Sequence, residues 1–456
     1  MTYQRGASAH DSAADPAQEY DTVAAPHGRG GGSDSSSRET GRTEAPARHA
    51  RRVTIALFAA GLTTFASMYS MQALLPSLSA AFSATPAHAA LAVSLTTGLL
   101  ALAIIPAGVL SSRFGRTRVM IASAVTASVI GMLLPFSPSL EVLLAGRAVQ
   151  GIALAGVPAV AMAYLAEEIG AGGLGAAMGV YISGTTLGGL AGRLIPAFAL
   201  EAASWRWAAA AVAVTAALCA IWFARGLPAS RRFTPQPLEF RALAVDFAGH
   251  LRNTRLLALF GLAFVLMGGF VSIYNFLGYR LIGAPFRLSD ATAGLVFLLY
   301  LAGTVSSTAA GRLADRTGRT RVLTVSVLTM AAGLAITLPN NLPTLLIGVL
   351  LCTAGFFGAH SVASSWVGSA ATGNRAGASS LYMFAYYLGS SIVGGAAGFA
   401  YGRHGWAGLT VYVGVLLAIA VALTASLVLN SRREVTSTSI HTTVYPILAR
   451  RSELSM

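Results

Sequence analysis

The chain has 456 residues, of which 55% are hydrophobic and 11% are charged. Soluble globular proteins carry roughly 25% charged residues, so this composition argues against a soluble domain and indicates a membrane protein. Arginine carries the whole basic load behind the net charge of +14. Because these arginines are scattered through short links between apolar segments, we expect no nucleic-acid partner. Cys219 and Cys352 lie inside apolar segments, which favours packing over a disulfide.

Twelve apolar segments follow one another, and each approaches the roughly 20 residues that a spanning helix needs. They occupy residues 53–78, 89–111, 119–136, 140–166, 174–199, 206–226, 256–279, 291–313, 321–338, 342–367, 376–401 and 407–430. The first is too long for a signal-peptide core, so we expect an uncleaved helix. Residues 1–52, rich in Gly and Ser, are expected to form a disordered tail, and residues 431–456 a second tail.

Arginine placement predicts the orientation of the spans. With the N-terminus inside, nineteen arginines between Arg48 and Arg433 fall on the cytoplasmic side of the spans, and four fall outside. The four outside are Arg206, Arg280, Arg287 and Arg403. Cytoplasmic links concentrate Lys and Arg, so both termini are predicted to be cytoplasmic.

An internal repeat divides the chain into two halves. The run from Gly108 to Arg118, GVLSSRFGRTR, recurs 203 positions later as GRLADRTGRTR, and both copies follow the second span of a half. A second echo relates Gly184, Gly188, Gly189 and Gly192 to Ser390, Gly394, Gly395 and Gly398. We therefore predict an all-α membrane protein with six-helix bundles over residues 53–227 and 256–430, joined by a cytoplasmic loop over residues 228–255.

The repeated G-x-x-x-D-R-x-G-R pattern resembles the signature loop of the major facilitator superfamily, and the resemblance covers about residues 53–430. In that family the loops latch the halves together when the transporter faces outward. Ser112 replaces the usual Asp, so we expect Glu167 or Glu168 to supply the acid for Arg113 or Arg116. The residues expected to form this cytoplasmic latch are Gly108, Arg113, Gly115, Arg116, Glu167, Glu168, Gly311, Asp315, Arg316, Gly318 and Arg319. The alternative is that these arginines only follow the positive-inside rule.

The fifth span carries glycines at a spacing of four, which favours close helix packing. Gly184-Thr-Thr-Leu-Gly188-Gly189 resembles an element of the drug-exporter branch, with Thr185 in place of its Pro. In the family this span lies near the interface of the halves, so the strip is expected to serve their rocking. The expected packing glycines are Gly184, Gly188, Gly189, Gly192, Gly394 and Gly398.

Polar residues within the spans indicate a substrate cavity, because burying them in a bilayer is costly. Arg147 with Gln150 resembles a second family motif, R-x-x-x-G, whose Arg faces the cavity; the alternative is an Arg that caps carbonyls of a neighbouring helix. Arg193 lies near the outer end of its span, and we expect it to reach the membrane surface. The expected cavity residues are Tyr69, Gln72, Arg147, Gln150, Asn275, His360 and Tyr386.

The spans hold no Asp or Glu near their centres, so a buried carboxylate is not available for proton coupling. His360 is the expected proton-binding group if protons drive transport, followed by Glu167 or Glu168. No nucleotide-binding loop and no convergent catalytic or metal-binding set is present, so we expect neither an enzyme nor a metal or cofactor site.

Three runs, beginning at Met178, Ser204 and Ser379, resemble a branch of bacterial inner-membrane permeases described as sugar or drug efflux proteins. The resemblance implies a monomeric secondary transporter of the inner membrane that exports small organic molecules against protons by alternating access. Uptake by symport, uncoupled facilitation and a non-transporting sensor on the same fold are left as alternatives.

Overall fold

The computed structural model describes residues 35–169, 171–230, 233, 235 and 240–453, and every element in them is helical. The first half contains α1 (Ser35–Tyr69), α2 (Leu75–Phe82), α3 (Pro86–Phe114), α4 (Arg116–Leu133), η1 (Leu134–Phe136), α5 (Leu140–Leu154), α6 (Gly156–Ile169), α7 (Ala171–Ala199) and α8 (Trp205–Gly226). The second contains α9 (Phe240–Arg252), α10 (Thr254–Ile282), α11 (Asp290–Gly294), η2 (Leu295–Leu299), α12 (Tyr300–Thr317), α13 (Arg319–Ile336), α14 (Leu342–Ala370) and α15 (Arg375–Glu453).

The number of spans agrees with the prediction. Eleven helical stretches of the described residues are long and apolar enough to cross a bilayer, and the last, Arg375–Leu429, is 55 residues long. Its backbone leaves the helical region at Gly405, where φ is 57° and ψ is −144°. That kink splits the stretch into two spans, so the described chain has twelve, six in each half.

Two predictions about the start of the chain differ from the structure. Helix α1 begins at Ser35, inside the predicted tail, of which residues 1–34 lie outside the described residues. The first span is not continuous over residues 53–78, because α1 ends at Tyr69 and α2 begins at Leu75, with Pro76 in its first turn. A proline favours a helix start and disfavours a helical residue before it. The central link holds α9, and α15 runs through the second predicted tail to Glu453.

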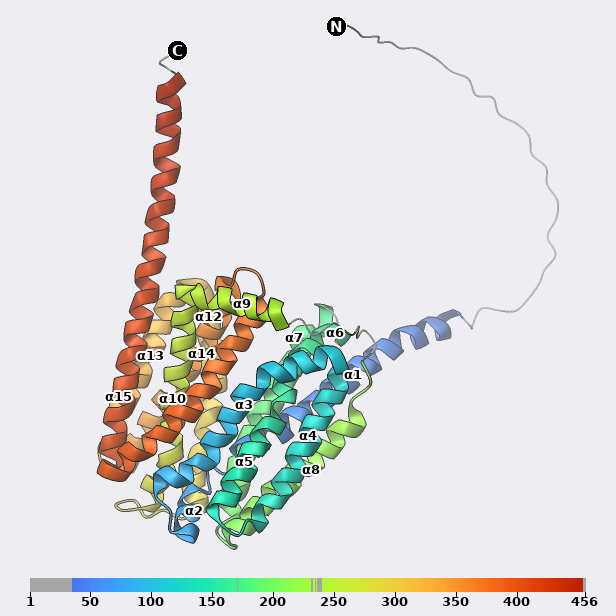
Figure 1. Cartoon of the computed structure of the whole chain (residues 1–456), viewed down its shortest axis with the longest axis vertical. Coiled ribbons are helices and arrows are strands. Elements are labelled where there is room, and N and C mark those ends of the chain that lie inside the picture. The colour runs from blue at the N-terminus through green and yellow to red at the C-terminus, as the bar shows by residue number, and fades with distance from the viewer. Residues whose placement is uncertain (1–34, 170, 231–232, 234, 236–239, 454–456) are drawn as a thin grey trace, which may run out of the picture. The chain divides into compact units, whose positions relative to one another are not determined.

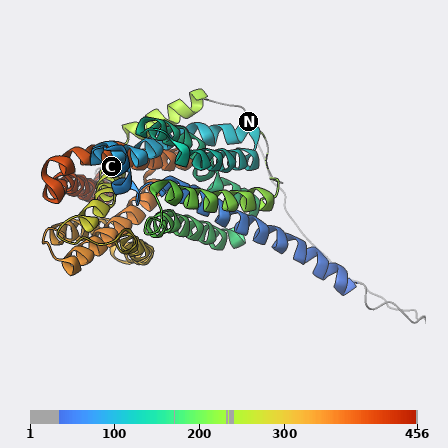
Figure 2. The same ribbon diagram turned by 90° about the horizontal axis from the view of Figure 1, so that it is seen from below.

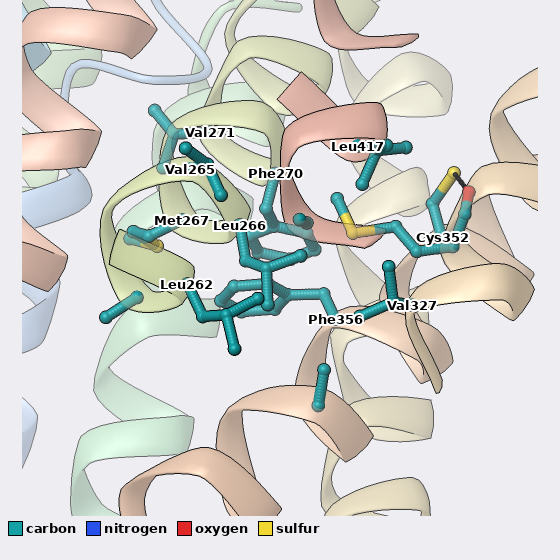
Figure 3. Close-up of a cluster of buried hydrophobic side chains, with 14 of the residues drawn as sticks. Leu262, Val265, Leu266, Met267, Phe270, Val271, Val327, Cys352, Phe356 and Leu417 are labelled. Carbon is teal, nitrogen blue, oxygen red and sulfur yellow. Dashed lines mark hydrogen bonds between the residues drawn. The ribbon is translucent and has the colours of Figure 1, made fainter. Parts of the chain in front are cut away.

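The helices before residue 227 and those after residue 254 form two neighbouring groups (Figures 1 and 2). Within the second group, α10 is buried on almost every side and anchors the largest apolar cluster (Figure 3). The Phe270 ring stacks on the Phe356 ring of α14, with centroids 4.0 Å apart. The first group divides its buried residues among smaller clusters. The two halves therefore have the same order of helices, but the second has one large apolar cluster and the first has several smaller ones.

The repeated loops have the same backbone conformation. Gly115 has φ 99° and ψ 139°, and Gly318 has φ 96° and ψ 139°. Residues with a Cβ rarely adopt such positive φ values, so the repeat keeps glycine at both positions. Six spans separate the loops, which puts them at one end of the bundle; we call it the loop end, and the opposite end, where α2 lies, the far end.

Among the described residues, the main contacts between the halves join α3 with α15, α7 with α11 and η2, and α2 with α10. At the first pair, the Gly98 backbone lies against the Ser391 side chain, and a Cβ added to Gly398 would lie 2.3 Å from Ala87 Cα. Ser390 donates a hydrogen bond to Thr97 Oγ1 across the same contact, at 3.3 Å. Small side chains thus let α3 and α15 approach closely, as they do in other membrane bundles.

The glycine strip of α7 does not lie between the halves, which corrects the expectation. A Cβ added to Gly184, Gly188 or Gly192 would lie 2.4–2.5 Å from a backbone oxygen of α1, in the same half. The strip therefore fixes α7 to α1 inside the first bundle. Its counterparts in α15 divide: Gly394 faces Val271 of its own half, whereas Gly398 faces α3 of the other half.

We expect Gly188→Ala to lower the Tm of the purified protein in detergent by several degrees. The added methyl group would meet the Leu62 carbonyl oxygen at 2.5 Å, and overpacking of this kind costs about 1–3 kcal/mol. Gly179→Ala is the matched control, because no atom lies within 4 Å of the added Cβ. Equal Tm values for the two variants would contradict the close packing of α7 on α1.

Candidate functional site: a polar junction between the halves

The break in the first span leaves backbone carbonyls of α1 without helical partners, and Arg147 of α5 binds them. Its Nη1 donates to the Ser67 carbonyl at 2.9 Å and its Nη2 to the Met68 carbonyl at 2.7 Å. Its Nε donates to the Ala92 carbonyl of α3 at 2.9 Å. The last four carbonyls of a helix lack donors from a following turn, and a bilayer supplies none. Arg147 thus stabilises the broken end of α1.

Arg147 is fully buried inside the first half. Gln150 accepts a hydrogen bond from Arg147 Nη1 and donates to the Ala127 carbonyl of α4 at 2.9 Å. All these partners belong to the first half, so the structure does not bring Arg147 or Gln150 to a surface shared with the second half. The geometry is that of the alternative interpretation, an Arg that caps carbonyls of a neighbouring helix.

A polar junction joins the halves just beyond this break. Arg193 of α7 donates from Nε to Gln72 Oε1 at 2.6 Å. Gln72 in turn donates from Nε2 to Asn275 Oδ1 of α10, in the second half, at 2.7 Å. Arg193 Nη2 reaches the Tyr300 hydroxyl of α12 at 3.1 Å, also in the second half. Arg193, Gln72 and Asn275 are each at most 2% exposed, so two hydrogen-bonded routes cross the interface in a buried place.

Aromatic rings hold the guanidinium of Arg193 from both halves. Its Cζ lies 3.9 Å from the Tyr69 ring centroid and 4.3 Å from that of Tyr300. Cation–π contacts of a desolvated guanidinium contribute about 2 kcal/mol or more. The expectation that Arg193 reaches the membrane surface is therefore wrong.

An aromatic wall of the second half continues from Tyr300. The Tyr300 ring packs on Phe270, which stacks on Phe356, and Phe356 stacks on the His360 imidazole. His360 Nδ1 lies 3.0 Å from the Tyr382 hydroxyl. Its ring centroid lies 4.7 Å from that of Tyr386.

The predicted cavity residues therefore separate into two groups. Tyr69, Gln72 and Asn275 meet at the polar junction, and Tyr386 packs against the cluster that contains Tyr69. His360 lies beside Tyr386 in the aromatic wall. Arg147 and Gln150 lie elsewhere, inside the first half. The residues that sequence reasoning missed are Arg193 and Tyr300. The buried Arg193 was a visible signal, but its partner Tyr300 is 107 residues away and nothing local indicates it.

Further contacts close the far end of the interface. The Tyr279 hydroxyl donates to the Leu75 carbonyl at 2.8 Å and lies 2.6 Å from Ser79 Oγ of α2. Glu201, after α7, accepts a hydrogen bond from the Ala291 amide of α11 at 3.0 Å. Hydrogen bonds from Ser289 and from this amide lower the pKa of Glu201. The ionised carboxylate therefore favours the contact between the halves.

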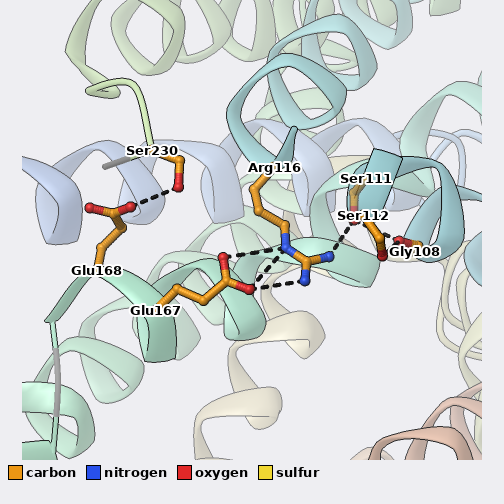
Figure 4. A network of polar contacts seen from close by, with 7 residues as sticks. All are labelled: Gly108, Ser111, Ser112, Arg116, Glu167, Glu168 and Ser230. Atoms are coloured by element: carbon orange, nitrogen blue, oxygen red, sulfur yellow. Dashed lines mark hydrogen bonds and ion pairs between the residues drawn. The ribbon is translucent and has the colours of Figure 1, made fainter. Parts of the chain in front are cut away.

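At the loop end, the first signature loop forms an ion pair within its own half (Figure 4). Arg116 donates from Nη2 to Glu167 Oε1 of α6 at 2.9 Å and from Nε to the same oxygen at 3.2 Å. Its Nη1 donates to Ser111 Oγ at 2.7 Å, and Ser111 donates to the Gly108 carbonyl. Glu167 thus provides the acid that Ser112 lacks. Glu168 has other partners: it accepts from Ser230 at 2.7 Å and lies 3.2 Å from His49 Nε2.

The second signature loop forms fewer contacts than the first in this conformation. Asp315 and Arg316 are exposed, and among the described residues Asp315 forms no ion pair. Arg319 donates instead to the Ser369 hydroxyl of α14. Position 369 lies near the repeat equivalent of Glu167, so the second half has no acid where the first half has one. Arg113 of the first loop is also exposed.

Two six-helix bundles that meet at a buried polar junction are the architecture of many membrane transporters built from internal repeats. The model of the Major Facilitator Superfamily matches residues 56–282 and again residues 259–449. Both halves are therefore covered, and the chain belongs to this superfamily of transporters.

Curated relatives agree with this assignment. The MFS-type transporter YybF of Bacillus subtilis is 41% identical over 377 residues, 83% of this chain and 93% of the relative. The inner membrane transport protein YnfM of Escherichia coli is 43% identical over 370 residues, 81% and 89% of the two chains. Among solved structures, a bacterial homologue of the human lysosomal transporter Spinster superposes with a TM-score of 0.67 at 16% identity, covering 84% of this chain and 97% of the other. The last comparison shows the fold.

We expect Arg147→Lys to lower the Tm in detergent strongly, by ten degrees or more. The three donors of an ammonium lie on one nitrogen, whereas the guanidinium spreads its donors over three nitrogens that reach separate carbonyls of α1 and α3. Each buried carbonyl left without a donor costs about 1–3 kcal/mol. Arg113→Lys is the control, since Arg113 is exposed in the first loop. If both variants melt at the wild-type temperature, Arg147 does not hold the broken helix end.

We expect the far end to open as the pH falls. The contact to α11 lowers the pKa of Glu201, so ionised Glu201 favours closure above the usual glutamate pKa. This contribution is lost as the pH falls through the lowered value. Spin labels at Ala202 and Arg403, both exposed at the far end of different halves, report the separation. They are placed in a Cys219→Ala, Cys352→Ala background. A pH dependence that persists unchanged in Glu201→Gln would contradict the role of this carboxylate.

Proposed function

We propose that this transporter exports small organic molecules, sugar-like or drug-like in character, in exchange for protons. It works by alternating access, in which the two halves expose a site between them to one side of the membrane at a time. The observation that carries the proposal is the polar junction of Arg193, Gln72, Asn275 and Tyr300, which draws its members from both halves. A site built in this way changes whenever the halves move.

The contacts of the described residues support a conformation closed at the far end. Tyr279, Glu201 and the polar junction connect the halves there. At the loop end, the ion pair of Arg116 with Glu167 and the bond from Arg319 to Ser369 each stay within one half. We propose that in the opposite conformation these loop residues bridge the halves as a latch, with the far-end contacts broken.

The loop end is proposed to face the bacterial cytoplasm. The excess of arginines in the links at this end supports that orientation. Both termini and the link over residues 228–255 are then cytoplasmic, and the bundles cover residues 53–227 and 256–430. The chain is proposed to act as a monomer, because each junction is complete within one copy.

The aromatic wall favours a substrate with an apolar body. Phe356, His360 and Tyr386 offer ring faces, and transporter sites of this kind orient a ligand with a few polar groups. Tyr69, Gln72 and Asn275 supply such groups at one end. Arg147 and Gln150 are proposed to act on transport only through the shape of the first half.

His360 is proposed as the proton-binding group. An imidazole is a side chain that can bind and release a proton, and that of His360 lies among Phe356, Tyr382 and Tyr386. Glu167 and Glu168 are second candidates, but Arg116, His49 and Ser230 occupy them in this conformation.

Flux into everted membrane vesicles tests the proposal. With a pH gradient acid inside, we expect at least one compound from a panel of sugars, dyes and antibiotics to accumulate, and collapse of the gradient to release it. His360→Gln should abolish accumulation while leaving exchange of labelled for unlabelled compound intact, because only the proton step is removed. Arg403→Gln, exposed at the far end, is the control.

Accumulation that needs no gradient would make the protein a facilitator. Accumulation only in right-side-out vesicles would make it an uptake system, and either result would contradict proton-coupled export. Full gradient dependence in His360→Gln would contradict the role of that residue alone.

A further inference from the structure

The polar junction has more hydrogen-bond donors than acceptors. A guanidinium has five N–H groups and an amide nitrogen has two. Arg193 uses its N–H groups on four acceptors: Gln72 Oε1, the Gly189 carbonyl at 2.6 Å, the Tyr300 hydroxyl and the Tyr69 hydroxyl. The Nδ2 atom of Asn275 is buried and makes no hydrogen bond within the described structure. At least three N–H groups thus lack an acceptor among the described residues, one on Arg193 and two on Asn275.

The junction also carries an uncompensated positive charge. The groups in contact with Arg193 are Gln72, Gly189, Tyr69, Phe297 and Tyr300, and none of them is acidic. A buried charge without a counter-charge is unfavourable, even when ring faces and dipoles offset part of the cost. Water accepts spare N–H groups, but it does not neutralise a charge. The chemical group that would match this junction has hydrogen-bond acceptors, no donors and a negative charge.

The donors come from both sides of the moving interface. Arg193 belongs to the first half and Asn275 to the second, and Gln72 joins them through its amide. Separation of the halves at the far end breaks this bridge and exposes both donors. A ligand that binds Arg193 and Asn275 together can replace the bridge, so its presence favours the closed conformation of both halves around it.

We infer that Arg193 and Asn275 recognise a carboxylate of the substrate, so that the transported molecules are organic acids with an apolar or aromatic body. This rests on the proposed transport through the junction and names its substrate class. Two carboxylate oxygens accept from the guanidinium and from the Asn275 amide, while the negative charge offsets Arg193. The ring faces of Tyr69 and Tyr300 lie against the Arg193 guanidinium. The body of the molecule is then proposed to lie along the aromatic wall that leads to His360.

Matched acid and neutral pairs test the inference by binding to the purified full-length protein. The pairs are benzoate with benzamide and phenylacetate with phenylacetamide, followed by equilibrium binding of the labelled compounds. We expect each acid to bind at least tenfold more tightly than its amide. Benzamide has a comparable ring and shape, so the difference reports the charge. Equal binding within both pairs, or no binding of either acid, overturns the inference.

Asn275→Asp is the decisive variant. It keeps an oxygen that accepts from Gln72 but replaces the unpaired donor by an acceptor and adds a negative charge. We expect it to fold and to lose acid binding at least tenfold. Arg193→Gln should lose acid binding likewise, and Arg206→Gln, which contacts Trp205 and carbonyls at the far end, should bind as wild type does. Wild-type acid binding in folded Asn275→Asp protein, verified by its Tm, would overturn the assignment.

These outcomes are separable from those of the flux experiment. Binding at equilibrium depends on neither direction nor proton coupling. Export of neutral compounds without acid preference leaves the proposed function and removes the inference. Acid binding without gradient-driven flux leaves the carboxylate site and removes proton-coupled export.

Discussion

The satisfaction of backbone carbonyls at the break in the first span is the constraint on which the rest of the structure depends. In a bilayer an open helix end must find donors within the protein, and Arg147 supplies three of them to α1 and α3. With that end fixed, the chain turns and presents Gln72 to the interface. Arg147, inside the first half, therefore fixes the position of the chain that leads to the junction, while Arg193 is part of the junction itself. The two arginines look alike in the sequence, and their neighbours distinguish them.

The interface combines close apolar contact with a few buried polar bonds. Small side chains bring α3 against α15, as Gly98 and Gly398 illustrate, and the polar junction adds direction to that contact. Hydrogen bonds across the interface can break and reform as the halves move, because each half keeps its own residues in place. The glycine strip of α7, by contrast, locks α7 to α1 within one half. Movement is thus expected between the bundles and not within the first one.

The halves have become unequal in where they carry charge. At the loop end the first half pairs Arg116 with Glu167, whereas Arg319 of the second half meets a serine hydroxyl. At the junction the first half provides the cation together with Tyr69 and Gln72, and the second half provides Tyr300 and Asn275 but no charge. An asymmetric site suits an asymmetric ligand, with a charged end toward Arg193 and an apolar body toward Phe356 and His360. In the proposed mechanism, the features shared by the two halves allow them to move relative to each other. The residues that differ between the halves bind the substrate.

The sequence by itself determined the class of fold. The lengths of the twelve apolar segments follow from the thickness of the bilayer. The glycines that both copies of the repeated loop keep, Gly115 and Gly318, have positive φ values that only glycine adopts easily. The sequence also identified Gln72 and Asn275 as buried polar residues. Only the tertiary structure decided that Arg147 binds carbonyls, that Arg193 bridges the halves, and that Glu167 and not Asp315 forms the ion pair. The physical reason is that a polar side chain in a span must find a partner, and that partner lies on another helix whose register no local pattern encodes.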